Sequence, residues 1–291
     1  MMLELSRAVQ RVLIRPEVSG VVVTQPADNI EETAYFVSIS LSDVFQNQNS
    51  KPIVFTTCMN PEDPMFDGTK NLLDSIRVAC HDVKGDISTV VVCMNGEIHA
   101  ASRAQLTHTN KASALASPGW GPVGYVDRDN VYFRCGALEL DTGLNFPMLK
   151  KLTAKVPVVK AMCGDDGALL EMFLEKEPDA IIVEGFGRGN LPAGMMPAIK
   201  KAVKKGIFVV ISTRASSGRV LDSTVFPGSV AQCLECGCLL AGETTTSKAR
   251  LLLMYVLSQK EAIQLKKEDP ERFFAYVQEC LDPVLTNRLF G

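Results

Sequence analysis

Asp28 is the first residue of this sequence whose type and position suit chemistry. It stands in GVVVTQPADNIEETAYF, just after the apolar run GVVVTQ (20–25), which predicts a buried strand. In open α/β sheets, ligands bind at the carboxyl ends of the strands, so a carboxylate here indicates a ligand site. The structural alternative is that Asp28 or Asn29 caps a helix whose first turn carries two glutamates. The two roles are compatible.

His108 is the second candidate, in SRAQLTHTNKASALASPGWGPVGYV (102–126). An imidazole titrates near about pH 6.5 and can act as a general base. Thr107 and Thr109 place hydroxyl groups beside it. The structural alternative is a surface or loop histidine. The single tryptophan, Trp120, follows in a loop rich in glycine and proline, where its ring either anchors the loop or lines a pocket.

A third candidate is the glycine-rich segment VEGFGRGNLP (183–192), between a predicted strand and a predicted helix. A glycine loop at a helix start can hold a phosphate group. However, the spacing here is G-x-G-x-G and not the dinucleotide pattern G-x-G-x-x-G. The segment therefore favours a tight turn from strand to helix, with Pro192 near the start of a helix that Asn190 caps.

Three thiols lie close together in AQCLECGCLL, at Cys233, Cys236 and Cys238. A structural zinc site usually needs four ligands, and no paired Cys or His motif lies nearby in the sequence. We therefore expect no metal. The nine cysteines are scattered among predicted strands and helices, which is typical of a reduced, cytoplasmic protein.

The composition argues against several classes of protein. The 291 residues are 46% hydrophobic and 22% charged, as in soluble globular domains, with a net charge of −3. This charge predicts binding neither to nucleic acid nor to an acidic membrane. No apolar run reaches the roughly 18 residues of a membrane span. The start, MMLELSRAVQRVLIRPEVSG, has the pattern of an amphipathic helix and not of a signal peptide.

Short apolar runs alternate with amphipathic segments along the chain, which predicts an α/β fold with a largely parallel sheet. The first half is predicted to contain a helix near 66–81 and two hairpins, the second turning at Asp127–Asn130. Its predicted strands lie at 20–25, 51–58 and 88–96.

The pattern is interrupted once and then resumes. Residues 135–155 have no clear period and are predicted to be a linker. After them come three apolar runs (VPVVKAM, DAIIVEGFG, IFVVISTR) and two helical segments (TTTSKARLLLMYVLSQ, DPERFFAYVQECL). We therefore predict a larger N-terminal domain at 1–134 and a smaller C-terminal α/β domain at 156–291.

These segments, in this order, resemble those of the bacterial-type L-asparaginases and asparaginase/glutaminases over nearly the whole chain. GVVVTQPADNIEETAYF is similar to the family's strand, second catalytic threonine motif and helix. SRAQLTHTN is similar to the segment with the catalytic lysine, and SPGWGPVGYV to the hairpin after it. GFGRGNLP, GIFVVISTRASSGRV and SKARLLLMYVLSQ are similar to parts of the C-terminal domain.

The resemblance implies an asparaginase-like two-domain α/β fold and hydrolysis of asparagine to aspartate and ammonia. It implies no metal and no organic cofactor. It also implies a homo-oligomer, a dimer or tetramer, whose sites lie at the sheet edge of the N-terminal domain and are completed by a neighbouring subunit.

The positions that match the family's catalytic residues are changed. We expect the family's first strand and its Gly-Gly-Thr loop to be lacking, because no Gly-Gly-Thr stands in the 291 residues. The second threonine's position is Ala27, whose methyl group can neither attack nor relay a proton. The lysine's position is His108, and only Asp28 matches. The resemblance therefore implies Asp28 and His108 as catalytic residues, and Ala27 and Asp28 as substrate-binding residues.

Two classes of function follow. The first is an asparaginase-family amidohydrolase with a degenerate active site, acting on a small amino-acid amide. The second is a catalytically inactive ligand-binding or assembly subunit that keeps the fold, which Ala27 and His108 motivate. A truncated gene product is the remaining alternative, and an in-frame Gly-Gly-Thr upstream of Met1 would reveal it.

Overall fold

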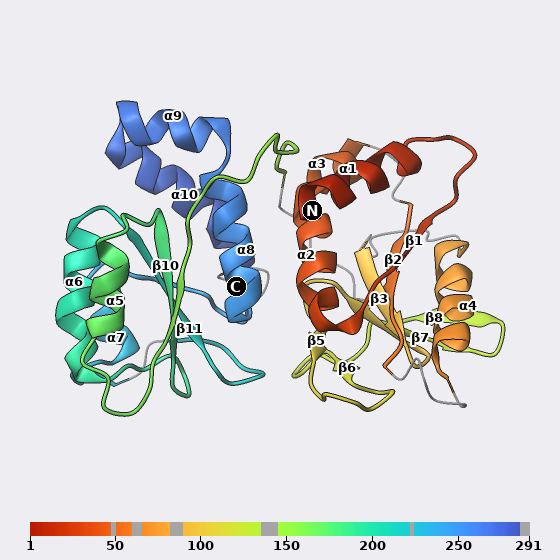
Figure 1. The fold of residues 1–291 in the computed structure, drawn as a ribbon, viewed down its shortest axis with the longest axis horizontal. Helices are drawn as coiled ribbons and strands as arrows, with labels where there is room; N and C mark the ends of the chain where they lie inside the picture. The colour runs from red at the N-terminus through yellow and green to blue at the C-terminus, as the bar shows by residue number, and fades with distance from the viewer. Residues whose placement is uncertain (48–50, 60–65, 82–89, 135–144, 222–223, 286–291) are drawn as a thin grey trace. The chain divides into compact units, whose positions relative to one another are not determined.

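The computed structural model describes residues 1–47, 51–59, 66–81, 90–134, 145–221 and 224–285. They form two compact units, Met1–Lys150 and Lys151–Gly291 (Figure 1). Each unit has its own sheet and its own core, which confirms the predicted two-domain α/β fold. Of the predicted linker, residues 135–144 lie outside the described residues, and its last residues divide between the two units. The predicted domain bounds stay a prediction.

The N-terminal unit is built on a six-stranded mixed sheet in the order β1-β2-β3-β4-β7-β8. The first three strands are parallel and the last three antiparallel. The second predicted hairpin is confirmed, because Asp127 pairs with Asn130 at its turn. The strands are β1 Val21–Thr24, β2 Ile53–Thr56, β3 Val90–Met94, β4 Glu97–Ala100, β7 Gly124–Asp127 and β8 Asn130–Phe133. A separate two-stranded ribbon joins β5 Gln105–Leu106 to β6 Leu115–Ala116.

Helices cover both faces of this sheet, which is why every residue of β2 and β3 is buried. Alternate residues of a strand point to opposite faces. In β2, Phe55 packs toward α1 and α2, whereas Val54 packs toward α4. The predicted N-terminal helix is therefore confirmed as α1, and the helix predicted near 66–81 as α4. The helices of this unit are α1 Met2–Leu13, α2 Ile30–Ser40, α3 Ser42–Asn47 and α4 Gly68–Ala79.

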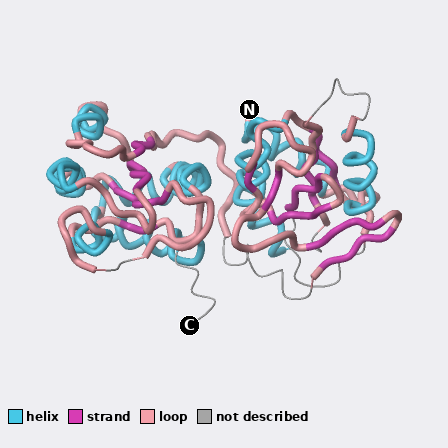
Figure 2. Tube along the Cα trace, turned by 90° about the horizontal axis from the view of Figure 1, so that it is seen from below, coloured by secondary structure: helices cyan, strands magenta, loops and turns pink. Residues whose placement is uncertain are grey.

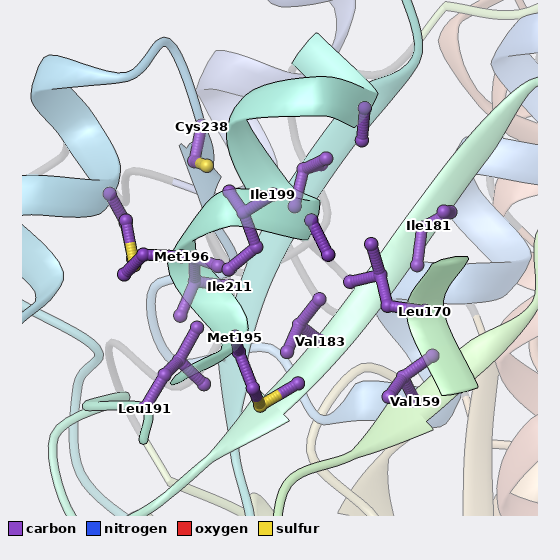
Figure 3. Close-up of a cluster of buried hydrophobic side chains, with 14 of the residues drawn as sticks. Val159, Leu170, Ile181, Val183, Leu191, Met195, Met196, Ile199, Ile211 and Cys238 are labelled. Carbon is purple, nitrogen blue, oxygen red and sulfur yellow. The ribbon is translucent and has the colours of Figure 1, made fainter. Parts of the chain in front are cut away.

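The C-terminal unit has a four-stranded parallel sheet in the order β12-β11-β10-β9. On one face, Ile181, Val183 and Ile211 pack against residues of α5 and α6 (Figure 3). On the other, the Phe208 ring contacts the rings of Phe273 and Phe274. Figure 2 shows the strands of this unit lying between its helices. The strands are β9 Val158–Lys160, β10 Ala180–Gly185, β11 Phe208–Thr213 and β12 Leu239–Leu240.

The remaining helices of this unit follow the sequence prediction with one addition. Both predicted late helices are confirmed, as α8 and α10. Between them lies α9, a helix with a single buried residue, Ala262, and so without the apolar period that would have predicted it. The helices are α5 Ala168–Leu174, α6 Met196–Lys204, α7 Val230–Glu235, α8 Thr246–Leu257, α9 Lys260–Glu268 and α10 Pro270–Leu285.

Cys93, in β3, makes the fold less stable as the pH rises into the alkaline range. Burial raises the pKa of its thiol from an ordinary value near 9 to about 12. Above pH 9 the unfolded chain loses this proton and the folded chain keeps it, so the free energy of unfolding falls as pH rises. We expect wild type to lose about 2 kcal/mol more than Cys93→Ala between pH 9 and 10.5 in urea unfolding. Equal losses in the two proteins would contradict this prediction.

Candidate active site at the carboxyl edge of the N-terminal sheet

Asp28 lies at the carboxyl end of β1, as the sequence predicts. β1 ends at Thr24, the Gln25 backbone N–H still donates to the Thr56 carbonyl of β2 at 3.3 Å, and Pro26 follows. Proline has no N–H to continue a strand ladder. The chain turns through a short 3₁₀ helix, Ala27–Asn29, and enters α2 at Ile30. The motif therefore stands at the edge of a parallel sheet where ligands usually bind.

The prediction that Asp28 or Asn29 caps α2 with its side chain is wrong. Neither side chain accepts a hydrogen bond from the first turn of α2. The 3₁₀ turn leads directly into the helix, and the Ile30 N–H bonds to the Ala27 carbonyl. The Asn29 Oδ1 atom instead accepts from Gln25 Nε2 at 3.3 Å.

Asp28 thus presents a carboxylate to solvent beside the first turn of α2. Its side chain is exposed, and within the described part of the chain it has no hydrogen-bond or ion-pair partner. Since no hydrogen bond or ion pair within the described segments engages this carboxylate, it is available to bind a cation such as the ammonium group of an amino acid.

Ala27, the residue before it, is half-buried in the same turn. Its methyl group can neither donate nor accept a hydrogen bond. It can contribute only an apolar contact to a ligand held by Asp28, so its assignment as a substrate-binding residue stays a prediction.

His108 lies in the turn between β5 and β6, where it is exposed. Its Nδ1 atom accepts hydrogen bonds from the backbone N–H groups of Asn110, at 3.0 Å, and Lys111, at 3.2 Å. In the neutral ring the proton therefore lies on Nε2, so the Nε2 atom is a hydrogen-bond donor. A general base needs a free lone pair, and here the Nδ1 lone pair already holds the turn together.

A hydrogen bond links the segment that carries Asp28 to the segment that carries His108, but the side chains of Asp28 and His108 are not themselves joined. The Glu31 Oε2 atom, in the first turn of α2, accepts the backbone N–H of Leu106 in β5 at 2.6 Å. Leu106 is two residues before His108. Among the described residues, Asp28 and His108 share no hydrogen bond or ion pair, so their action as base and orienter stays a prediction.

Two threonine hydroxyl groups near the candidate site, those of Thr107 and Thr56, are engaged by the backbone. The Thr107 Oγ1 atom donates to the Ala114 carbonyl at 2.9 Å and closes the β5–β6 turn. Thr56, at the end of β2, donates to the Cys93 carbonyl at 2.9 Å and is buried. Both hydroxyl groups serve the backbone.

The glycine-rich segment after β10 forms the tight turn that its spacing favours. Phe186 and Asn190 exchange backbone hydrogen bonds of 2.8 and 3.0 Å. Gly187 and Gly189, inside the turn, have positive φ angles of 47° and 108°. The prediction that Asn190 caps the helix after Pro192 is wrong. Asn190 Oδ1 accepts from the Val230 N–H at the start of α7, and not from the helix after Pro192.

The three clustered cysteines lie in the core of the C-terminal unit. Cys233 and Cys238 are buried, and the Cys233 thiol contacts the Met196 sulfur at 3.9 Å. A hydrogen bond from the Cys238 thiol lowers the pKa of Cys233. In the described residues, no three His, Cys, Asp or Glu side chains gather in a way that could hold a metal ion.

Among the residues that the structure describes, no helix is both long and apolar enough to cross a membrane.

Comparison with known proteins decides the family. The family model described as "Asparaginase, N-terminal" matches residues 1–137, and "Glutaminase/Asparaginase C-terminal domain" matches 155–268. An L-asparaginase of Bacillus licheniformis is 31% identical over 268 residues, which are 91% of this chain and 80% of the relative. The chain belongs to the asparaginase family.

Two other similar proteins show how widely the asparaginase family extends. A crystal structure of a probable cytoplasmic L-asparaginase from Campylobacter jejuni matches with a TM-score of 0.78 at 26% identity, covering 95% of this chain and 82% of that one. A glutamyl-tRNA(Gln) amidotransferase subunit of Pyrococcus horikoshii is 27% identical, covering 84% of this chain and 56% of the relative. The family resemblance read from the motifs is therefore confirmed.

Proposed function

We propose that this chain is an amidohydrolase of the asparaginase family with a degenerate active site. In this proposal Asp28 binds the α-ammonium group of a small amino-acid amide such as asparagine, and the amide is hydrolysed to a carboxylate and ammonia. The observation that carries the proposal is the exposed Asp28 carboxylate at the carboxyl edge of the sheet, which has no hydrogen-bond or ion-pair partner among the residues that the structure describes.

The side chains near Asp28 support binding better than fast turnover. Hydrolysis of an amide by covalent catalysis requires a nucleophile and a base that removes its proton. Ala27 supplies neither, and the Nδ1 lone pair of His108 accepts two backbone N–H groups. The Nε2–H group of His108 suits donation to a carbonyl or carboxylate oxygen of the ligand. Loss of groups that act together in catalysis commonly lowers a rate by several orders of magnitude.

The experiment measures ammonia release from asparagine and glutamine, and aspartate affinity by calorimetry, for wild type and Asp28→Asn. We expect the substitution to weaken aspartate binding at least about tenfold, as the loss of a charge-assisted hydrogen bond does. The matched control is Asp127→Asn, which removes another exposed and unpartnered carboxylate of the described chain. We expect the control to bind like wild type. Equal affinity in all three proteins would contradict a role for Asp28.

The second candidate function is a catalytically inactive ligand-binding or assembly subunit. The engaged Nδ1 atom of His108 favours it, because a histidine that holds a turn is not free to act as a base at that atom. By its name, the relative from Pyrococcus horikoshii is a subunit of a larger enzyme. This candidate predicts that aspartate raises the melting temperature while no ammonia is released. Clear ammonia release by the purified chain would refute it.

We also propose a cytoplasmic homo-oligomer, a dimer or tetramer, whose ligand is a small amino acid or its amide. The scattered free cysteines support the location, and the family resemblance supports the assembly. We expect neither nucleic acid nor a membrane as a partner. Light scattering after size exclusion would determine the number of subunits.

A further inference from the structure

We infer that Glu31 is a positioning residue that sets the His108 turn in place relative to Asp28. Its Oε2 atom accepts the backbone N–H of Leu106 at 2.6 Å. Glu31 stands three residues after Asp28, and Leu106 stands two residues before His108. This hydrogen bond therefore joins the two segments that carry the predicted site. The inference rests on the proposed function, because it assumes that both segments face one ligand.

Glu31 is suited to this task by its position in α2. It is half-buried in the first turn of a helix, where the helix dipole stabilises a negative charge. A hydrogen bond to an ionised acceptor is shorter and stronger than one between neutral groups. The 2.6 Å distance between the Glu31 oxygen and the Leu106 nitrogen fits this kind of bond.

The β5–β6 ribbon has bonds of its own that fix its shape. Gln105 pairs with Ala116, the Thr107 N–H donates to the Ala114 carbonyl at 2.7 Å, and His108 Nδ1 accepts two further backbone N–H groups. These bonds lie within the ribbon and determine how His108 sits on it. They do not tie the ribbon to α2, whereas the Glu31 bond does.

Packing holds the ribbon and α2 in the same core without Glu31. Leu115 of β6 belongs to one buried cluster with Ile30 and Ala34 of α2. Loss of the Glu31 carboxylate therefore leaves the fold in place and frees only the end of β5 that leads to His108. Hence the effect of a substitution at Glu31 should appear in ligand affinity more than in stability.

Glu32 provides a matched control one residue further on. It is a half-buried carboxylate in the same first turn of α2, but within the described part of the chain it has no hydrogen-bond or ion-pair partner. Removing it changes the charge at the helix end as much as removing Glu31 does. Within the described segments, the hydrogen bond to Leu106 is the polar contact that Glu31 makes and Glu32 does not.

The test compares Glu31→Ala, Glu31→Gln and Glu32→Ala with wild type in aspartate titrations. We expect Glu31→Ala to weaken binding about tenfold, the effect of one lost charge-assisted hydrogen bond. Glu31→Gln keeps an acceptor oxygen, so we expect binding within about threefold of wild type, and Glu32→Ala within about twofold. A Glu31→Ala affinity equal to that of Glu32→Ala would overturn the inference.

Nuclear magnetic resonance gives a second readout that needs no ligand. With three histidines in the chain, the imidazole signals of His108 can be assigned by substitution. We expect Glu31→Ala to shift the His108 ring signals and to speed hydrogen exchange of the Leu106 amide, and Glu32→Ala to change neither. If wild type binds no aspartate, the proposed function fails and these signals still decide the inference. Unchanged His108 signals in Glu31→Ala would overturn it.

Discussion

Phe55→Ala is expected to lower the free energy of unfolding by about 3–5 kcal/mol, the usual loss for a buried phenylalanine. Phe55 is fully buried in β2, between Val23 of β1 and Val92 of β3 in the sheet register. Its ring packs into the cluster that also holds residues of α1 and α2. The cavity left by alanine therefore lies beside β1, the strand that leads to Asp28.

Urea unfolding of wild type and Phe55→Ala measures this loss. Phe66→Ala is the matched control, because its ring is 42% exposed in the same unit and its removal leaves no buried cavity. We expect the control to stay within about 0.5–1 kcal/mol of wild type. A loss for Phe55→Ala no larger than that of Phe66→Ala would contradict the assignment of Phe55 to the core.

The elements that carry the site could be predicted because each has a strong local pattern. GVVVTQ predicts a strand by its apolar run, and Pro26 marks its end. The position of Asp28 beyond that strand follows from the order of the elements alone. The turn at Asp127–Asn130 is equally local, since the residues that form it are adjacent in the sequence.

The contacts that define the chemistry of the site could not be predicted, because they join distant or competing groups. Leu106 lies 75 residues from Glu31, and no spacing rule links them. The sequence offers several acceptors for the Asn110 N–H, and only the fold selects His108 Nδ1. The predicted cap failed for a similar reason: the 3₁₀ turn gives the Ile30 N–H a backbone acceptor, so α2 begins without a side-chain cap.

Asn71→Ala is expected to cost on the order of 3 kcal/mol, because the buried Asn71 amide makes three hydrogen bonds that an alanine side chain cannot make. The Asn71 amide is only 1% exposed. Its Nδ2 atom donates to the Thr57 carbonyl at 2.9 Å and to Asp67 Oδ2 at 3.0 Å. Its Oδ1 atom accepts the Asn95 N–H at 2.9 Å. One side chain thus ties the end of β2 to the turn that follows β3.

The β3–β4 turn is joined to Asn71 through the Asn95 N–H. Asn95 and Gly96 have positive φ angles of 53° and 78°, as in the two-residue turns that suit a twisted hairpin. In Asn71→Ala the Asn95 N–H loses its acceptor, so its hydrogen exchange should become faster together with the loss of stability in urea. Asn130→Ala, at the exposed turn of the other hairpin, is the control and should stay within about 0.5–1 kcal/mol of wild type. Unchanged exchange at Asn95 in Asn71→Ala would show that the amide is held by other groups, and that the sheet edge beside Asp28 is organised without Asn71.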